Sequence, residues 1–304
     1  MRHHATHYPL LGTVVAVSFD APEEICRTVE DELILTIERY EQIFSAFEPT
    51  SELNQWIRGE SPRHSPEFVE AMRLARYWQE RSGSRFNPLV GRLSNLWIQA
   101  TERGEPPDSA ALARMAESIA TPRFEIDEDR VTRLSDCDGF NLNALAKGFI
   151  VDRAATEVSQ RFSLTDLVVN AGGDLRHVGL HTHLVAIANP RRAYDNEPPL
   201  CEVNATNRAV ATSGQNRRGQ RIGSQWFGHV IDPRTGWPVE GLASVSVIGS
   251  DGATADVWAT ILSCMDPVEA VALTESAADL GCLVVTDDGQ MFSDAQWDAL
   301  IVQR

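Results

Sequence analysis

The sequence predicts an α+β fold in which a mixed, largely antiparallel sheet is flanked by helices. Segments with strand character and segments with helical periodicity follow one another irregularly, without the regular alternation that is typical of a doubly wound parallel sheet. No repeat, low-complexity tract or long linker divides the chain, so we expect residues 1–304 to form a single domain. With 304 residues, 43% of them hydrophobic, the chain can bury a sizeable core.

The first part of the chain is predicted to contain one strand followed by helices. Residues 10–20 are rich in β-branched side chains and lie between two prolines, which is typical of a strand. Apolar side chains then recur with helical spacing over residues 22–44, and residues 85–97 are expected to form a loop that leads into a helix. Capping residues mark three further helix starts: Thr50 or Ser51, Ser65 followed by Pro66, and Asp108.

The rest of the chain is predicted to mix short strands with helices. Residues 123–135 alternate apolar and polar side chains on either side of a turn, which predicts a hairpin. Ile150, Ala154 and Val158 recur at i, i+4 and i+8, so a helix that begins near Lys147 should pack on a sheet. Short strands are expected at residues 166–170, 184–188, 209–212, 228–232, 243–249 and 280–286. Two more helices are expected at residues 252–265 and 267–278.

The composition argues against several classes of partner. A formal net charge of -16 would repel the phosphate backbone of a nucleic acid. No apolar run of about 18 residues occurs, and the N-terminal segment lacks the apolar core of a signal peptide. The five cysteines are odd in number and form no CxxC pair, which indicates reduced thiols. We therefore expect a cytoplasmic protein that binds neither nucleic acid nor membrane.

The histidines are interpreted as structural. His177, His181 and His183 have the spacing of metal ligands, but we see no acid that accompanies them and expect strand-edge residues instead. The N-terminal histidines are expected to lie in a mobile terminus, and they are His3, His4 and His7.

Three segments place polar side chains where a ligand could bind. Lys147 lies at a predicted helix start, where unpaired main-chain N–H groups attract anions. Asp256 and Thr260 are one helical turn apart, on the face opposite the apolar residues of their helix, and offer the hard oxygen atoms that Mg²⁺ accepts. His229 lies near the exposed end of a strand and is a candidate base or hydrogen-bond donor. Taken alone, each feature is also typical of an ordinary solvated helix or strand end.

Taken together, eight segments occur in the order and spacing of one known family. They are LGTVVAV, SAFEPTSELNQW, RFNPLVGRLSNLW, NLNALAKGFIVDRA, LVVNAGGDLRHVG, VATSG, HVIDPRTGWPV and ADVWATIL. By these motifs the chain resembles the ApbE family, the FAD:protein FMN transferases, from about residue 10 to about residue 285. AKGFIVD, NAGGD and HVIDPRTG are the most specific of the matching stretches.

The resemblance implies a single ApbE-type domain that binds FAD and Mg²⁺ and transfers FMN to a Ser or Thr hydroxyl of an acceptor protein, with release of AMP. It implies that Asp256, Thr260 and the carbonyl of Ala144 are metal ligands. Lys147, His229 and Asp256 are the catalytic residues that it implies. The cofactor-binding residues that it implies are Leu11, Phe47, Phe86, Asn87, Asn141, Lys147, Gly172, Gly173, Ser213 and His229.

The sequence also departs from the family pattern. Asn87 and Asn141 stand where family members commonly have Asp, Leu11 replaces a Met, and Phe47 replaces a Tyr. Each exchange of Asp for Asn replaces an acceptor oxygen by a donor NH₂ group and removes a charge. Two alternatives to the transferase therefore stay open. They are an FAD pyrophosphatase, in which water replaces the acceptor hydroxyl, and a non-catalytic FAD-binding protein.

Overall fold

A computed structural model describes residues 1–60, 63–192, 197–214 and 219–302 of the chain. The chain divides into two compact units. Unit 1 contains Met1–Glu41, Leu145–Ser213 and Ala243–Arg304, and unit 2 contains Gln42–Ala144 and Gly214–Leu242. The single domain expected from the sequence stays a prediction.

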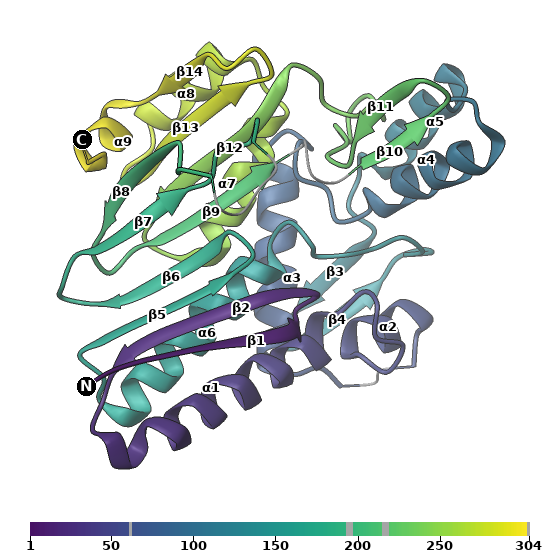
Figure 1. Ribbon diagram of the computed structural model, residues 1–304. Coiled ribbons are helices and arrows are strands. Elements are labelled where there is room, and N and C mark those ends of the chain that lie inside the picture. Colours follow the sequence, from purple (N-terminus) through teal and green to yellow (C-terminus); the bar gives the residue numbers. More distant parts are fainter. Residues whose placement is uncertain (61–62, 193–196, 215–218, 303–304) are drawn as a thin grey trace. The chain divides into compact units, whose positions relative to one another are not determined.

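An eight-stranded sheet forms the centre of unit 1 (Figure 1). In spatial order its strands are β1 (Arg2–Leu10), β2 (Thr13–Asp20), β5 (Asp166–Ala171), β6 (Asp174–Gly179), β9 (Ala209–Gly214), β12 (Leu242–Gly249), β13 (Gly281–Thr286) and β14 (Met291–Ser293). The pairs β1/β2, β2/β5, β5/β6, β6/β9 and β13/β14 are antiparallel. The predicted α+β class with a largely antiparallel sheet is thus confirmed.

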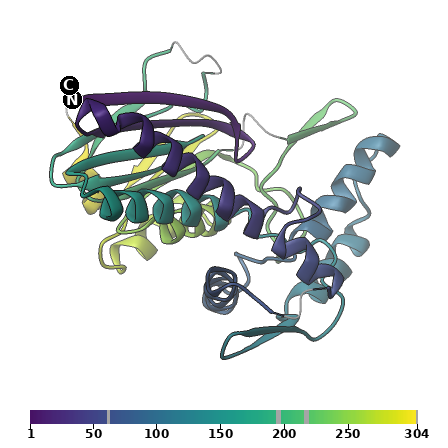
Figure 2. The same cartoon turned by 90° about the horizontal axis from the view of Figure 1, so that it is seen from below.

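Helices cover one face of this sheet. They are α1 (Glu23–Phe44), α6 (Ala146–Phe162), α7 (Gly252–Ser263) and α8 (Pro267–Glu275). Figure 2 shows α1 in purple and α6 in teal along the same face. Ile150, Ala154 and Val158 are buried, as their spacing predicts, and α6 packs on β5 and β6. The same helix also packs against α7, which brings two of the predicted site segments together.

A hairpin and a short helix cover the other face of the sheet. The hairpin is formed by β7 (His183–Ile187) and β8 (Cys201–Ala205), and the helix is α9 (Ala295–Leu300). The apolar side chains of the hairpin share a core with Trp297 of α9 and with Val168 of the sheet. Since side chains alternate along a strand, Leu167 and Val169 point to the helical layer. Strand β5 is therefore buried on both faces, and its apolar side chains are contiguous only from Leu167 to Val169.

Unit 2 consists of helices and two small hairpins. The helices are α2 (Glu52–Arg58), α3 (Pro66–Arg81), α4 (Gly91–Arg103) and α5 (Ser109–Ile119), and the hairpins are β3 (Phe124–Asp127) with β4 (Arg130–Arg133) and β10 (Gly219–Ile222) with β11 (Gln225–Gly228). The predicted caps are confirmed, because Ser51, Ser65 and Asp108 each accept a hydrogen bond from a first-turn N–H group. Trp56 and Trp97 donate indole hydrogen bonds to the carbonyls of Val131 and Gly236, which ties α2 to strand β4 and α4 to a turn within the unit.

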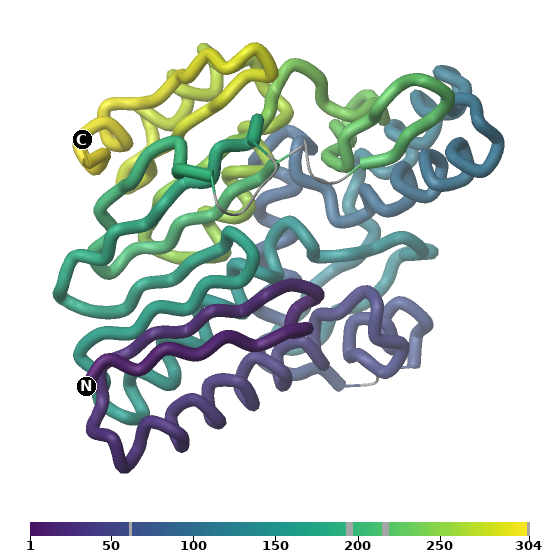
Figure 3. The backbone as a smooth tube through the Cα atoms, viewed as in Figure 1, coloured from purple at the N-terminus to yellow at the C-terminus, as the bar shows by residue number. Residues whose placement is uncertain are grey.

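The N-terminal segment differs from the prediction of a mobile terminus. It forms β1, the edge strand beside β2 that Figure 3 traces from the N-terminus. His3 and His7 lie on one face of this strand, with their Nε2 atoms 2.7 and 3.1 Å from the carboxylate of Glu30 on α1. The strand is ordered because it pairs with β2 over nearly its whole length, a long-range interaction that composition does not reveal.

The predicted strand at residues 228–232 is also wrong. β11 ends at Gly228, and Asp232 lies in a turn closed by the bridge between Ile231 and Pro238. The Asp232 carboxylate accepts a hydrogen bond from the N–H of Arg234, and Pro233 lacks an N–H donor, so this segment favours a turn over pairing in a β-sheet.

In the part of the chain that the structure describes, no helix has both the length and the apolar surface that crossing a bilayer requires.

Candidate functional site

Lys147 lies in the first turn of α6, where the sequence places it, but it is not a solvated surface lysine. Its ammonium group is ion-paired with the carboxylate of Asp174, the first residue of β6. The Asp174 side chain is only 3% exposed, whereas that of Lys147 is 29% exposed. The lysine therefore reaches from a partly open helix start to a buried acid.

The turn between β5 and β6 sets the position of Asp174. Gly172 and Gly173 have φ angles of +61° and +107°, which favour glycine. A Cβ atom at Gly172 would lie 2.5 Å from Oγ1 of Thr13, so a larger residue there would push the turn away from β2. Oδ1 of Asn170 also accepts a hydrogen bond from the N–H of Gly173 at 3.2 Å. The glycine pair thus makes a tight, defined turn immediately before the acid.

Asp256 on α7 is the second carboxylate of this region. We expected it on a face of the helix opposite the apolar side chains, but it is buried, with 6% of its surface exposed. Its Oδ2 atom accepts a hydrogen bond of 3.1 Å from the main-chain N–H of Gly148. Burial raises the pKa of Asp256 to about 7, and the charge of Asp174 adds to this rise. The charge of Lys147 and the Gly148 hydrogen bond act in the opposite direction.

Two glycines bring α6 and α7 into direct contact. A Cβ atom at Gly148 would lie 2.1 Å from the carbonyl oxygen of Gly252 and 2.8 Å from Cβ of Asp256. A Cβ atom at Gly252 would in turn lie 2.3 Å from the carbonyl oxygen of Gly148. Only residues without a side chain fit at this crossing. The close approach is what allows the start of α6 to donate a hydrogen bond to Asp256.

Hydroxyl groups extend the site along α7. Thr260, one turn after Asp256, has its Oγ1 atom 3.5 Å from Oγ of Ser213 near the end of β9. Carboxylate and hydroxyl oxygens suit Mg²⁺, so Asp256 and Thr260 fit the expected metal by their chemistry. Ala144, whose carbonyl is the third expected ligand, is the last residue of its segment in unit 2. Within the described residues, His, Cys, Asp and Glu side chains form no group of three or more that could hold a metal ion.

The structure does not gather all of the expected site residues in one unit. Lys147, Asp256, Thr260 and Ser213 lie in unit 1 together with the glycine pair and Leu11. Leu11 occupies the tight turn between β1 and β2 with a φ of 54°. The others belong to unit 2, and they are Phe47, Phe86, Asn87, Asn141, Ala144 and His229. Among these, Phe47 is 84% exposed, His229 is exposed and Phe86 is buried.

Asn87 has a structural task within unit 2. Its side chain is buried, its Nδ2 group donates to the carbonyl of Ile119 at 2.8 Å, and its Oδ1 atom accepts from the N–H of Leu89 at 2.9 Å. An aspartate could not donate to Ile119 at neutral pH. Asn141 is only half-buried. Its Oδ1 atom accepts from the N–H of Asn143 at 3.2 Å, a bond that a carboxylate could also accept, and its Nδ2 group donates to the carbonyl of Gly139 over a longer distance of 3.5 Å.

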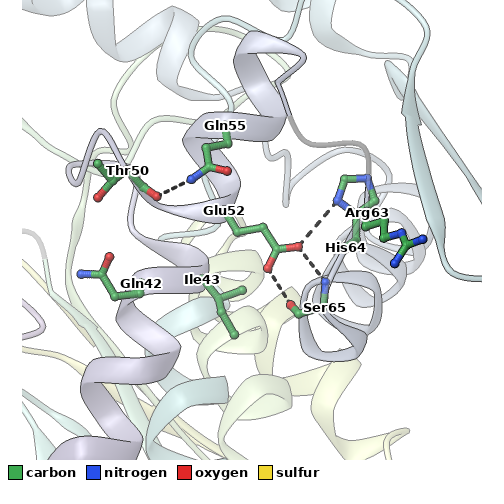
Figure 4. Close-up of a pocket in the computed structure, with 8 residues that line it drawn as sticks. All are labelled: Gln42, Ile43, Thr50, Glu52, Gln55, Arg63, His64 and Ser65. Atoms are coloured by element: carbon green, nitrogen blue, oxygen red, sulfur yellow. Dashed lines mark hydrogen bonds and ion pairs between the residues drawn. The ribbon is translucent and has the colours of Figure 1, made fainter.

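A separate cavity of about 440 Å³ lies in unit 2 (Figure 4). Its lining residues are Gln42, Ile43, Thr50, Glu52, Gln55, Arg63, His64 and Ser65. Glu52 accepts hydrogen bonds from the N–H and the hydroxyl of Ser65, at 2.8 and 2.7 Å, which ties α2 to the start of α3. Thr50, Glu52 and Gln55 of the lining belong to the motif SAFEPTSELNQW, but none of the expected site residues lines the cavity, so we do not assign the chemistry to it.

Two acids were missed in the sequence. Asp174 is the last residue of the motif NAGGD, in which a strand is followed by a glycine pair and an acid. Its position directly after the glycine turn was the signal that could have identified it. Asp166 is the second. Its Oδ2 atom lies 3.2 Å from Nε2 of His177, so it is the acid partner that the sequence analysis did not find for the histidines. His177 is completely buried, and its Nδ1 atom accepts a hydrogen bond from the N–H of Asn207, so Nε2 carries the proton and donates to Asp166.

Comparisons with known proteins agree with the motifs. A sequence model described as the ApbE family matches residues 11–284. The chain is 26% identical over 287 residues to a FAD:protein FMN transferase of Klebsiella pneumoniae (strain 342), covering 91% of this chain and 87% of that protein. It is also 26% identical over 293 residues to a FAD:protein FMN transferase of Vibrio cholerae, covering 92% and 87%.

Solved structures share the fold. The crystal structure of the ApbE protein from Thermotoga maritima superposes with a TM-score of 0.86 at 22% identity, covering 100% of both chains. The flavin transferase ApbE from Vibrio cholerae superposes with a TM-score of 0.79 at 22% identity, covering 99% of both chains.

Proposed function

This chain belongs to the ApbE family, as the match over residues 11–284 shows, and we propose that it is an FAD:protein FMN transferase. In the proposed reaction a Ser or Thr hydroxyl oxygen of an acceptor protein attacks the phosphorus of the FMN half of FAD. The bond from that phosphorus to the bridging oxygen breaks, FMN becomes a phosphoester of the acceptor, and AMP leaves. The curated relatives that carry this activity in their names support the proposal.

The observation that carries the proposal is that Asp256 accepts the N–H of Gly148, the residue after Lys147, at the start of α6. The ammonium group and the first N–H groups of the helix offer positive charge to a diphosphate. The Asp256 carboxylate accepts the N–H of Gly148 at this helix start and can also accept a hydrogen bond from an acceptor hydroxyl. We therefore assign diphosphate binding to Lys147, and assign to Asp256 the orientation of the acceptor hydroxyl and removal of its proton.

We assign Mg²⁺ binding in unit 1 to Asp256 and Thr260, and the carbonyl of Ala144, in unit 2, stays the third ligand that the family resemblance implies. The first two supply oxygen donors from one face of α7, one turn apart, which is the donor chemistry that this ion prefers. Bound there, Mg²⁺ would neutralise the negative charge that develops on the diphosphate. Ser213, close to Thr260, is assigned to the same cofactor region.

The flavin half of FAD is assigned to the motif residues that remain. We place His229 and Phe47 against the flavin because both side chains are exposed in unit 2. Leu11, Asn141 and the Gly172–Gly173 turn are assigned as further cofactor contacts. Phe86 and Asn87 are buried within unit 2, so we assign them the indirect task of holding their loop.

The two alternative functions differ in what accepts the FMN group. With water as acceptor, the same residues would act as an FAD pyrophosphatase. A non-catalytic FAD-binding protein was suggested by the exchange of Asp for Asn at two positions. The buried bonds of Asn87 explain one of these exchanges structurally and weaken that alternative. A cytoplasmic location stays a prediction.

The proposal is tested by incubating the protein with FAD and Mg²⁺, with and without an acceptor domain that carries an exposed Thr. We expect AMP release together with an FMN-sized mass gain on the acceptor, and loss of both when EDTA removes the metal. If AMP and free FMN are released at the same rate whether or not an acceptor is present, for every acceptor tried, the protein is a pyrophosphatase. FAD that stays bound and intact would identify a binding protein.

Variants connect this test to the site. Asp256→Asn and Lys147→Gln should each lower transfer by about tenfold or more, because each removes a charge that acts on the reacting groups. The matched control is Asp31→Asn, which removes an acid of the exposed Arg27–Asp31 pair. Normal transfer in both site variants would contradict the assignment.

A further inference from the structure

Lys147 is the single lysine of the chain. The sequence contains 27 Lys and Arg residues, and only Lys147 is a lysine. A lysine ammonium is a compact charge with three donors, whereas a guanidinium is a planar fork, so the two do not fit the same partners. At this one position the chain carries the compact cation, and Asp174 is its ion-pair partner.

Asp174 is well suited to hold that cation in place. Its side chain is 3% exposed, and a buried carboxylate is costly unless it is paired. It follows a turn in which Gly172 fits closely against Thr13, so its main chain has little freedom. Asp174 is thus the fixed partner of the ion pair, and the long, flexible side chain of Lys147 is held in a defined position by it.

The second carboxylate of the region has another hydrogen-bond partner. Oδ2 of Asp256 accepts the N–H of Gly148, the residue after Lys147. The main chain at the start of α6 is therefore held by Asp256, while the lysine side chain is held by Asp174. Two acids from different elements thus fix two different groups of adjacent residues.

We propose that Asp174 is the positioning residue for Lys147, holding its ammonium group where the diphosphate of FAD binds. This inference rests on the proposed flavin transfer. Asp174 is assigned no contact with FAD or with the metal. It acts through Lys147, and its removal should matter only while the lysine is present.

The first test uses the fact that an amine-directed acylating reagent has Lys147 as its one lysine target. Acylation at a fixed pH, followed by peptide mass spectrometry, reports how firmly the amine is held without requiring turnover. Asp174→Asn should raise the rate of Lys147 acylation by several fold, and Asp174→Glu, which keeps the charge, should restore part of the protection. The control is Asp294→Asn. It alters another buried acid of unit 1, which caps α9 through the N–H of Trp297.

The second test is a double-mutant cycle with Lys147→Gln and Asp174→Asn. We expect Asp174→Asn alone to lower kcat for AMP release by about tenfold, and to change kcat less than about twofold when Lys147 is already Gln. Thermal unfolding of each variant shows that it is folded. Independent effects of the two changes, or unchanged acylation in Asp174→Asn, would overturn the inference.

The two tests separate this inference from the proposed function. If the wild-type protein binds FAD but transfers nothing, the proposed function fails, and the acylation result still decides whether Asp174 holds Lys147. If transfer occurs and the cycle is additive, the function stands and the positioning role fails.

Discussion

The main-chain N–H of Gly148 donates a hydrogen bond of 3.1 Å to Oδ2 of Asp256, which joins the first turn of α6 to the middle of α7. This bond depends on the contact between Gly148 and Gly252, where neither residue has room for a Cβ atom. The residue before Gly148 is the lysine that we assign to the diphosphate. The helix crossing therefore fixes both the lysine and the acid of the proposed site.

Gly148→Ala should separate these two helices. The new Cβ atom would meet main-chain atoms of Gly252, which cannot move aside as a flexible side chain can. We expect a loss of about 1–3 kcal/mol in the free energy of unfolding, measured by urea denaturation, and a clear loss of FMN transfer. Gln160→Ala, at an exposed position of the same helix, should change stability by less than about 0.5 kcal/mol. Equal stability of the two variants would show that the crossing tolerates a side chain.

Asn87→Asp should destabilise the protein even though it introduces the residue that is common in the family. A carboxylate at this position would face the carbonyl of Ile119, to which Asn87 now donates. We expect a loss of about 1–3 kcal/mol at pH 7 by urea denaturation. Asn141→Asp is the matched control and should lose less, below about 1 kcal/mol, because the carboxylate can still accept from Asn143 and the donor bond that it gives up, to Gly139, is 3.5 Å long at a half-buried position.

The pH dependence of the Asn87→Asp variant gives an independent check. A protonated carboxyl can donate to Ile119, so folding should raise its pKa above the ordinary value of about 3.9. The variant should then recover stability, relative to wild type, at acidic pH and lose it as the pH rises through the folded-state pKa. A pH-independent difference would point to a cause other than the hydrogen bond.

Asp166→Asn should weaken the end of the sheet where three elements meet. Asp166 is ion-paired with Arg2 and lies 3.2 Å from His177. Burial acts to raise the pKa of Asp166, but the bonds from Arg2 and His177 outweigh it, and the net shift is downward. We expect a loss of about 1–3 kcal/mol at pH 7 in urea denaturation, since the carboxylate of a partly buried ion pair is removed.

The sign of the pH effect at Asp166 follows from its lowered pKa. The stabilisation is present above the unfolded-state pKa of about 3.9 and is lost as the pH falls through the lower, folded-state value. The wild-type and Asp166→Asn proteins should therefore converge in stability as the pH falls below the folded-state pKa of Asp166. The exposed Arg27–Asp31 pair supplies the control, because Asp31→Asn should cost less than about 1 kcal/mol at any pH.

Lys147→Arg should not behave as a conservative change. The planar guanidinium is larger than an ammonium group and pairs with Asp174 in a different geometry. We expect kcat for AMP release to fall by about tenfold or more while the thermal unfolding temperature stays close to that of wild type. The reverse exchange at the surface, Arg27→Lys, should leave kcat unchanged. Full activity of Lys147→Arg would mean that only the positive charge at this position matters.

The sequence by itself determined the features that depend on neighbouring residues. Ser51, Ser65 and Asp108 cap helices as predicted, because a cap acts over three residues of the same segment. The start of α6 near Lys147 and its buried stripe follow from helical periodicity in the same way. The family motifs, which are also local stretches, placed the chain in its family before any geometry was known.

Only the tertiary structure decided which acids meet Lys147 and how they behave. Asp174 and Asp256 come from different elements, and the burial that raises the pKa of Asp256 to about 7 is created by packing around it. The edge strand β1 and the donor role of Asn87 likewise depend on partners far away in the chain. Spacing along a helix gives the direction of a side chain, but burial and charge pairing arise only when separate elements pack together.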